Sequence, residues 1–442
     1  MRITAIYDTV PNLTTRLNGP LLHIESEFLA GQAQIETWLR REWQSTPAPF
    51  YASVDLRNAG FKLAPVDTNL FPAGFNNLAP ELMPLSIQAV QSAMEHQCPD
   101  AVRALILAED HTRNRFYFES LHVLQSILHN AGYECRIAAL RVRGEAETIA
   151  LDGGRQLRVE ALVRSGNRVV TEGFDPCVIV LNNDLAGGIP DLLQEIEQTI
   201  VPAPELGWAS RRKSEHFAAY AQVCTEFARQ IDLDPWLIQP VFRDCGEIDF
   251  MKRTGEDCLA RNVETILAEI KVKYREYGVD REPFVVVKSD AGTYGMGVMM
   301  VRSPDEVLGL NRRQRTQMAS AKGGRPVDRV ILQEGVYTFE GVGTDGSPAA
   351  AEPVIYMIDR FVVGGFYRVH TRRGDDENLN APGMHFEPLA FAEPCTMPNP
   401  SMAPDAGPNR FYAYGVVARL AALAAAREAA QKATARSLRK TA

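Results

Sequence analysis

The stretch PFVVVKSDAGTYGMGV, which runs from Pro283 to Val298, decides how the rest of the chain is interpreted. Its apolar, mostly β-branched residues from Phe284 predict a β-strand that ends at Lys288. A glycine-rich turn follows at Gly292, Gly295 and Gly297. Because glycine has no Cβ, such a turn can bring backbone N–H groups against phosphate oxygens, and the lysine adds a positive charge beside them. The stretch therefore predicts a phosphate-binding site, with a plain turn between hairpin strands as the alternative.

The composition favours a folded chain of two or three domains. It has 442 residues, of which 45% are hydrophobic. The 47 basic and 55 acidic residues give a net charge of -8, which argues against nucleic acid as the principal partner. Neither a secretion signal nor a long apolar run is present, so we expect no membrane insertion. The 7 cysteines are scattered and never form a C-x-x-C pair, which predicts reduced thiols in a cytoplasmic protein.

The first part of the chain predicts a helix and then a β-α-β crossover. Apolar residues at helical spacing predict an amphipathic helix from Ile24 to Trp43. Between residues 101 and 140, two apolar strands flank an amphipathic helix, and CVIVLNND predicts a further strand, so we expect a parallel sheet. Ligands gather at the carboxyl ends of such strands. The polar tip there supplies the candidate substrate-binding residues His111, Arg113 and Asn114. An ordinary loop is the alternative.

The segment from Phe50 to Pro84 is dense in Asn, Asp, Gly and Pro, and it predicts a long loop. Folded loops of this length are more often binding elements than idle connectors. We therefore expect it to hold a small polar substrate through Asp67, Asn69 and Asn76. The alternative is that these side chains only satisfy the turns of the loop.

The second half of the chain contains five further signals. Pro202 to Ala219 predicts a linker and then a helix headed by Lys213, and a longer helix is expected over residues 256–277. VILQEGV predicts a strand that carries Glu334. VIYMIDR and FVVGGFYRVHT predict neighbouring strands, and an alanine-rich helix is expected over residues 412–432.

These elements, in this order, resemble those of ATP-grasp ligases; the stretch around Lys288 is neither a Walker loop nor a dinucleotide fingerprint. The resemblance implies that ATP and Mg²⁺ are bound. Lys213 matches a lysine at the head of a helix, with Arg211 and Arg212 as alternatives, and Glu334 matches an acid that takes a ribose hydroxyl. The implied nucleotide-binding residues are Lys213, Lys288, Gly292, Gly295, Gly297, Gln333, Glu334 and Val336.

The same resemblance implies catalytic and metal-binding roles. The implied catalytic residues are Lys288, Arg368 and Asn380, of which Arg368 grips the phosphate being transferred. Glu377 and Asn380 are the implied metal ligands. The sequence departs from the family here, because Leu379 stands where D-alanine ligases have an asparagine and His370 where they have an aspartate.

The resemblance also implies an α/β fold with α+β elements. A parallel-sheet domain like the pre-ATP-grasp domain is expected at residues 1–204. An ATP-grasp-like domain of two α+β lobes is expected at residues 205–410, and a C-terminal helix at residues 411–442.

Across nearly all of its length the chain resembles the glutamate-cysteine ligase family of certain proteobacteria. The resemblance is carried by PVDTNLFPAGFNN, EDHTRN and ENLNAPGMHF in this order. It implies ATP-dependent joining of the glutamate γ-carboxyl to the cysteine amine through an acyl phosphate, which is the first step of glutathione synthesis. The expected partners are amino acids and ATP, and a homo-oligomer is left open. The alternatives are another amide ligase similar to glutathione synthetase and a nucleotide-binding regulatory module without turnover.

Overall fold

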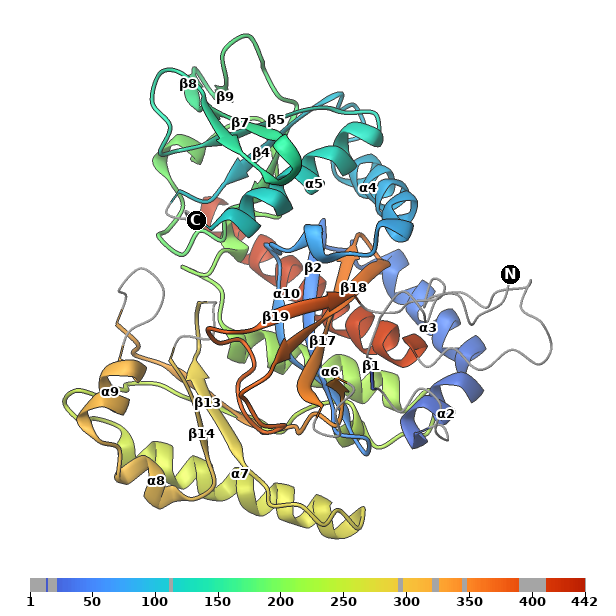
Figure 1. Ribbon diagram of the computed structural model, residues 1–442, viewed down its shortest axis with the longest axis vertical. Coiled ribbons are helices and arrows are strands. Elements are labelled where there is room, and N and C mark those ends of the chain that lie inside the picture. The colour runs from blue at the N-terminus through green and yellow to red at the C-terminus, as the bar shows by residue number, and fades with distance from the viewer. Residues whose placement is uncertain are drawn as a thin grey trace.

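The computed structural model describes residues 13–14, 22–110, 114–292, 297–319, 326–343, 348–388 and 411–441. This part of the chain is a mixed α/β structure with four β-sheets. Figure 1 shows one lobe around β4 and β5, a central part around β17, β18 and α10, and a third lobe around β13, β14 and α7.

The N-terminal lobe is built on a six-stranded sheet with the order β11-β10-β4-β5-β7-β6. Its strands are β4 (Arg103–Ala108), β5 (Glu134–Ala139), β6 (Glu147–Ala150), β7 (Gln156–Ala161), β10 (Val178–Asn182) and β11 (Thr199–Val201). All pairs are parallel except β6 with β7. Beside them lie α4 (Met83–Gln97), η4 (Asp152–Gly154), η5 (Asp191–Leu193) and the small hairpin of β8 (Val163–Ser165) and β9 (Arg168–Val170). The predicted β-α-β crossover is confirmed, with α5 (Arg115–Asn130) between β4 and β5.

The central part contains a seven-stranded antiparallel sheet. Its strands are β1 (Leu13–Thr14), β2 (Tyr51–Asn58), β3 (Leu63–Asn69), β16 (Gly341–Val342), β17 (Ala349–Ile358), β18 (Phe361–His370) and β19 (His385–Pro388). The long strand β17 pairs with β16, β18 and β2, and β2 pairs in turn with β3. The prediction of two neighbouring strands at β17 and β18 is confirmed.

The predicted long loop from Phe50 to Pro84 is wrong up to Asn69, because this part forms the hairpin of β2 and β3. Its apolar residues are buried in the core, and its polar residues lie at the site described below. The polar composition therefore reflected a site on a sheet. The rest of the segment is irregular and contains η2 (Phe75–Asn77) and η3 (Pro80–Leu82).

The predicted helix at residues 24–43 is divided by Gly31 into α2 (His23–Ala30) and α3 (Gln32–Ser45). The chain is crowded at the break, since a Cβ on Gly31 would lie 3.1 Å from Cγ2 of Ile231.

The third lobe contains a four-stranded antiparallel sheet with the order β12-β15-β13-β14. Its strands are β12 (Phe242–Cys245), β13 (Val285–Ser289), β14 (Val298–Val301) and β15 (Val330–Glu334). The helices of this region are α6 (Lys213–Ala228), α7 (Glu256–Glu276), α8 (Pro304–Leu308) and α9 (Arg312–Met318), with the short turns η6 (Pro204–Leu206) and η7 (Pro235–Leu237). The predicted starts of α6 at Lys213 and of α7 at Glu256 are confirmed.

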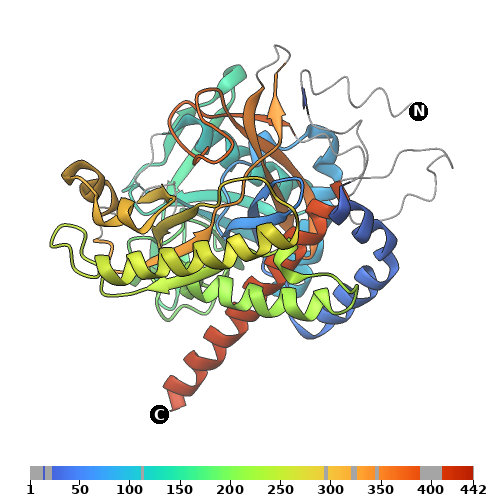
Figure 2. The same ribbon diagram turned by 90° about the horizontal axis from the view of Figure 1, so that it is seen from below.

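The C-terminal helix α10 (Phe411–Thr441) is a central element of the core. Its residues from Phe411 to Ala426 are buried, and it packs against α6, β3 and β2. Small alanine side chains allow this close approach on all sides of the helix. Figure 2 shows the other end of α10 extending away from the body of the protein.

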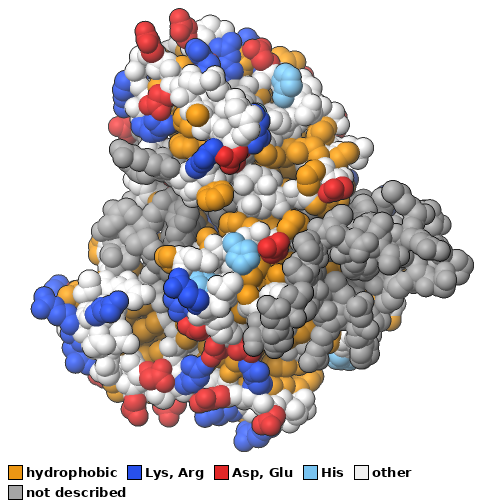
Figure 3. All heavy atoms as spheres, in the orientation of Figure 1, with side chains coloured by type: hydrophobic (Ala, Val, Ile, Leu, Met, Phe, Trp, Pro, Cys, Tyr) orange, Lys and Arg blue, Asp and Glu red, His pale blue; other side chains and the backbone are white. Residues whose placement is uncertain are grey.

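No helix in the described ranges is long and apolar enough to cross a membrane. On the face drawn in Figure 3, Lys and Arg side chains alternate with Asp and Glu side chains.

Candidate active site

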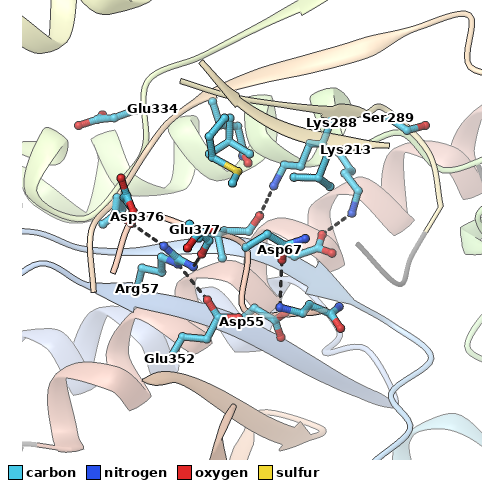
Figure 4. A pocket seen from close by; sticks show the side chains of 18 of the residues that line it. Asp55, Arg57, Asp67, Lys213, Lys288, Ser289, Glu334, Glu352, Asp376 and Glu377 are labelled. Atoms are coloured by element: carbon cyan, nitrogen blue, oxygen red, sulfur yellow. Dashed lines mark hydrogen bonds and ion pairs between the residues drawn. The ribbon is translucent and has the colours of Figure 1, made fainter. Parts of the chain in front are cut away.

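A cleft lies between the four-stranded sheet and the seven-stranded sheet, and we call it the main cleft (Figure 4). The space between its walls, counted together with the part that opens to solvent, is about 810 Å³. The four-stranded sheet contributes Val286, Lys288, Ser289, Val298, Met300, Gln333 and Glu334. The seven-stranded sheet contributes Asp55, Arg57, Val66, Asp67, Glu352 and Arg368. The head of α6 contributes Lys213, and the loop after β18 contributes Asp376, Glu377, Asn378 and Asn380.

Lys288 extends across the main cleft from one sheet to the other. The pairing of β13 places Val286 and Lys288 on the cleft side, whereas Val285 and Val287 belong to the hydrophobic core. The Lys288 Nζ donates a hydrogen bond to the Val66 carbonyl oxygen at 2.5 Å. Burial lowers the pKa of Lys288 to about 8, although Asp67 acts in the opposite direction. The predicted strand thus delivers its lysine to a cavity.

Lys213 is the second cation of the main cleft. Its Nζ lies 2.5 Å from Oδ1 of Asp67 and 4.4 Å from the centre of the Trp208 ring. Burial alone would raise the pKa of Asp67, but Lys213 and Lys288 outweigh this effect and lower it to about 2. Asp67 is therefore a carboxylate held between two lysines that come from different elements.

The turn after β13 fixes the start of α6. The Asp290 carboxylate accepts hydrogen bonds from the backbone N–H and the hydroxyl of Ser214, each at 2.8 Å, and its carbonyl oxygen accepts the Lys213 N–H. Gly292 lines the main cleft with a φ of 95°, a value that favours glycine. Gly297 also has a positive φ and accepts the Ser289 N–H, whereas Gly295 lies outside the described residues.

Arg368 lies between two carboxylates on the floor of the main cleft. Its Nη1 is 2.8 Å from Oδ2 of Asp55 and 2.5 Å from Oε1 of Glu352, which is its cross-strand partner on β17. Burial is the main reason that the pKa of Asp55 is raised, because it outweighs the opposite effect of Arg368. Burial acts likewise on Glu352, but Arg57 and Arg368 together lower the pKa of that group.

Arg57 ties the floor of the main cleft to the loop after β18. Its Nε donates to Oε2 of Glu352 at 2.9 Å, and its Nη1 donates to the carbonyl oxygens of Val336 and Asp375. It also donates to the Glu377 carbonyl oxygen. This buried guanidinium therefore holds together three segments that line the main cleft.

Glu334 lines the main cleft through its backbone, but its carboxylate lies on the other face of β15. It accepts hydrogen bonds from Lys62 Nζ at 2.8 Å, from Trp236 Nε1 at 3.1 Å and from the Val241 N–H at 3.0 Å. Figure 4 shows this side chain pointing away from the other acids. A ribose-binding role for the Glu334 carboxylate does not fit this geometry, because three buried donors already hold it.

Gln333 and Val336 do line the main cleft, as expected for this segment. Gln333 is paired across the sheet with Val286, so both side chains lie on the cleft face. Gln333 is 2% exposed, and its Nε2 has no hydrogen-bond partner among the described residues. A carboxamide group has both donor and acceptor atoms, so its free nitrogen can donate to a ligand while its oxygen accepts from the same ligand.

Glu377 and Asn380, the predicted metal ligands, both line the main cleft. The Glu377 carboxylate accepts the Gly374 N–H at 2.8 Å and pairs with Arg373 at 2.6 Å; these two contacts lower its pKa. Among the described residues, no group of three or more His, Cys, Asp or Glu side chains is arranged to hold a metal ion alone. Any metal here would need oxygen ligands from a bound substrate as well.

Three other predicted substrate residues, Asn69, Asn76 and Asn114, do not line the main cleft. Asn69 makes a turn with Phe71, and Asn114 caps α5 by accepting the Phe116 N–H. Asn76 lies in η2 and does not line the main cleft. His111 and Arg113 lie outside the described residues.

Sequence reasoning noted Asp55 and Arg57 among the charged residues of the Phe50–Pro84 segment, but it missed other residues of the main cleft, namely Ser289, Glu352, Asp376 and Asn378. One signal was available for Glu352, because it is the only acidic or basic residue of the ten in β17. An acid in an otherwise apolar strand needs a buried partner. The partner, Arg368, was already a candidate.

Comparisons with known proteins agree with one another. The sequence model of the GshA family, described as glutamate-cysteine ligase, matches residues 25–429. A crystal structure named "Putative gamma-glutamylcysteine synthetase" from Methylobacillus flagellatus KT has 58% sequence identity and a TM-score of 0.86, and the match covers 96% of this chain and 99% of that chain.

A more distant match carries no argument about fold or activity. The D-alanyl-alanine synthetase A of Vibrio cholerae O1 biovar eltor str. N16961 has 9% identity and a TM-score of 0.28, over 57% of this chain and 66% of that chain. No curated protein sequence matches the chain.

Proposed function

Because this chain belongs to the glutamate-cysteine ligase family, an enzyme family that joins L-glutamate to L-cysteine, we propose that the main cleft is where the joining takes place. The protein is a ligase that produces γ-glutamylcysteine, and this reaction is the first step of glutathione biosynthesis. The observation that carries the proposal is the convergence of Lys213, Lys288 and Arg368 on one cleft beside a glycine-containing turn.

The chemistry of amide formation explains why such a cluster is needed. A carboxylate is a poor acyl donor, and transfer of the terminal phosphoryl group of ATP gives an acyl phosphate with a good leaving group. Phosphoryl transfer needs little covalent work from the protein and depends on positioned positive charge. We assign this charge to Lys213 and Lys288, which reach the same place from α6 and β13.

Backbone N–H groups of the turn at Gly292 would add donors to the phosphate oxygens. Arg368 would hold the phosphoryl group during transfer, with Asn380 beside it. Both residues line the same cleft, although Arg368 is paired with Asp55 and Glu352 in this structure.

Adenine would bind where the main cleft is apolar. Val286, Val298, Met300 and Val336 form this part of the lining. The Gln333 carboxamide would pair with the adenine edge, whose amino group is a donor and whose ring nitrogen is an acceptor. The backbone from Gln333 to Val336 would supply the other hydrogen bonds to the base.

The donors present fit Mg²⁺, which prefers oxygen and is usually held by one or two carboxylates plus substrate phosphates. We keep Glu377 and Asn380 as candidate ligands and add Asp55 and Glu352, whose paired carboxylates open onto the main cleft. When bound, the metal ion neutralises charge on the phosphate oxygens. Ligation through Asp55 and Glu352 would also release Arg368 from its two ion pairs.

We further propose that the two sheets around the main cleft are the two lobes of an ATP-grasp domain. One of these lobes then extends beyond the expected range of residues 205–410, because β1, β2 and β3 of the seven-stranded sheet come from the first 69 residues of the chain. This proposal is supported by the lysine-bearing strand, the turn after it and the segment Gln333–Val336, which all contribute residues to the lining of the main cleft. The extensive burial of α10 argues that the last segment is packed as part of the central core.

The test is a phosphate-release assay with components omitted one at a time. We expect release only when ATP, Mg²⁺, glutamate and cysteine are present together, because the acyl phosphate is productive only when an amine captures it. Replacing glutamate and cysteine by γ-glutamylcysteine and glycine tests the reaction of glutathione synthetase. Rapid release without any amino acid would refute the assignment of the main cleft to ligation.

A further inference from the structure

A second cavity borders the same turn as the main cleft. The two share Ser289, Ala291 and Gly292 in their linings. The polar side chains that distinguish the second cavity are Trp208, Arg212, Asp290, Asp328 and Arg329. A ligand in this cavity would therefore lie next to the phosphate end of a nucleotide in the main cleft.

We propose that the second cavity is an amino-acid subsite, in which Arg212 binds the carboxylate and Asp328 the ammonium group of a substrate. The inference rests on the proposed function, because it presumes that the main cleft holds the nucleotide. Its ligand class is an α-amino acid, and both glutamate and cysteine have this chemistry.

The first argument is that these two charges are free. Arg212 is half-buried, and neither its guanidinium nor the Asp328 carboxylate has a hydrogen-bond or ion-pair partner in the described part of the chain. The other two charged groups are already used, because Asp290 holds Ser214 and Arg329 pairs with Asp244 at 2.9 Å. A cavity with one free cation and one free anion matches a zwitterion.

Trp208 adds a second observation. It is 2% exposed and lines the second cavity, and its indole N–H has no hydrogen-bond partner within the part of the chain that the structure describes. A buried indole N–H normally has a partner. A substrate carboxylate beside Arg212 could supply that acceptor after a small adjustment of the ring.

The second cavity also lies where an α/β sheet collects ligands. The backbone N–H of Trp208 donates a hydrogen bond to the Asp184 carbonyl oxygen at 2.9 Å. Asp184 follows the carboxyl end of β10. Strands β10 and β4 are parallel neighbours, and ligands bind outside the carboxyl ends of such strands. Ala186, in the loop after β10, also lines the second cavity.

The start of α6 lies between the second cavity and the main cleft. Arg212 and Lys213 are consecutive residues at the head of this helix, and they line the second cavity and the main cleft, respectively. Asp290 holds the start of this helix in place through its contacts with Lys213 and Ser214. A substrate bound by Arg212 is therefore positioned beside a phosphate bound by Lys213.

The experiment compares steady-state kinetics of Arg212→Gln and Asp328→Asn with the wild type. Glutamate is varied at saturating cysteine, then cysteine at saturating glutamate, and then ATP. We expect Arg212→Gln to raise the KM of one amino acid about 10- to 100-fold, because a hydrogen-bonded charge pair is lost, and to leave the KM of ATP within about twofold. Asp328→Asn should raise the KM of the same amino acid, which identifies the occupant.

Matched variants separate binding from folding. Arg212→Lys keeps the charge but loses the planar fork, so its KM should lie between those of Arg212→Gln and the wild type. Arg312→Gln removes an exposed arginine from α9 and should change nothing. If Arg212→Gln fails to fold, Asp328→Asn still tests the subsite, because Asp328 is exposed and its replacement should not prevent folding.

Two outcomes overturn the inference. Unchanged amino-acid KM values in folded Arg212→Gln and Asp328→Asn would show that the second cavity does not bind substrate. A rise in the KM of ATP alone would assign the second cavity to the nucleotide. Failure of the wild type to couple ATP, glutamate and cysteine would instead refute the proposed function of the main cleft.

Discussion

Replacing Lys288 by methionine tests the main cleft most directly. Methionine keeps the length and the apolar stem of the side chain but removes the charge. In the folded protein, burial lowers the pKa of Lys288 from 10.5 to about 8, and this drop disfavours its charged form by about 3 kcal/mol. The variant escapes this cost but loses the hydrogen bond to the Val66 carbonyl oxygen, worth about 1.5 to 3 kcal/mol. The two effects nearly cancel, so we expect Lys288→Met to fold.

The loss should instead appear in turnover. By analogy with the removal of one preorganised donor, kcat should fall roughly 10²- to 10³-fold, which corresponds to about 3 to 4 kcal/mol of transition-state stabilisation. The assay measures phosphate release under saturating substrates, with thermal melting on the same preparations. Lys271→Met, an exposed lysine on α7, is the matched control and should keep full activity. Full activity of folded Lys288→Met would remove the phosphate site from this strand.

Three further predictions concern the same region. Because the pKa of Lys288 is about 8, the affinity for ATP measured by calorimetry should weaken as the pH rises through 8. Lys288→Arg stays charged, so its affinity for ATP should depend less on pH. The same pH dependence in Lys288→Arg and the wild type would contradict the assignment. Gln333→Glu removes the amide donor and should lower kcat/KM for ATP about 10- to 100-fold, whereas an equal effect on GTP would show that Gln333 does not read the base. Glu334→Gln leaves the buried Lys62 unpaired and should reduce the free energy of unfolding in urea by about 3 to 5 kcal/mol. The control is Glu269→Gln, which breaks an exposed ion pair with Arg243 and should lower the free energy of unfolding by less than about 1 kcal/mol.

The spacing of apolar residues in the sequence predicted those helices and strands whose buried residues recur at regular intervals. Apart from Arg103 at the start of β4 and Asn182 at the end of β10, these two strands are apolar, because both faces of the parallel sheet are covered. The buried residues of α7 likewise follow the helical spacing seen in the sequence. The hairpin of β2 and β3 was missed for the opposite reason. Asp55, Arg57 and Asp67 belong to strands, but their charges are needed in the main cleft, so the segment has the composition of a loop.

Pairings between distant segments could not be predicted from local patterns. Glu352 is opposite Arg368 only because β17 and β18 are in one register, and Arg57 reaches Glu352 from β2. A shift of one residue in either strand would turn these side chains to the other face of the sheet. The charges of the main cleft are therefore a property of the sheet register, which a single sequence does not reveal.

The role of Glu334 depends on which face of β15 its side chain lies on. It follows Gln333 on β15, so the two side chains point to opposite sides of the sheet. Gln333 faces the main cleft, while Glu334 reaches Lys62, which lies between β2 and β3 of the other sheet. The buried ion pair thus joins the two sheets that form the main cleft, directly behind the segment expected to bind adenine. Breaking it should loosen the relative position of Lys288 and Asp67 as well as the fold, so Glu334→Gln should raise the KM of ATP even though its carboxylate does not face the nucleotide. An unchanged KM in a destabilised Glu334→Gln would confine this acid to a purely structural role.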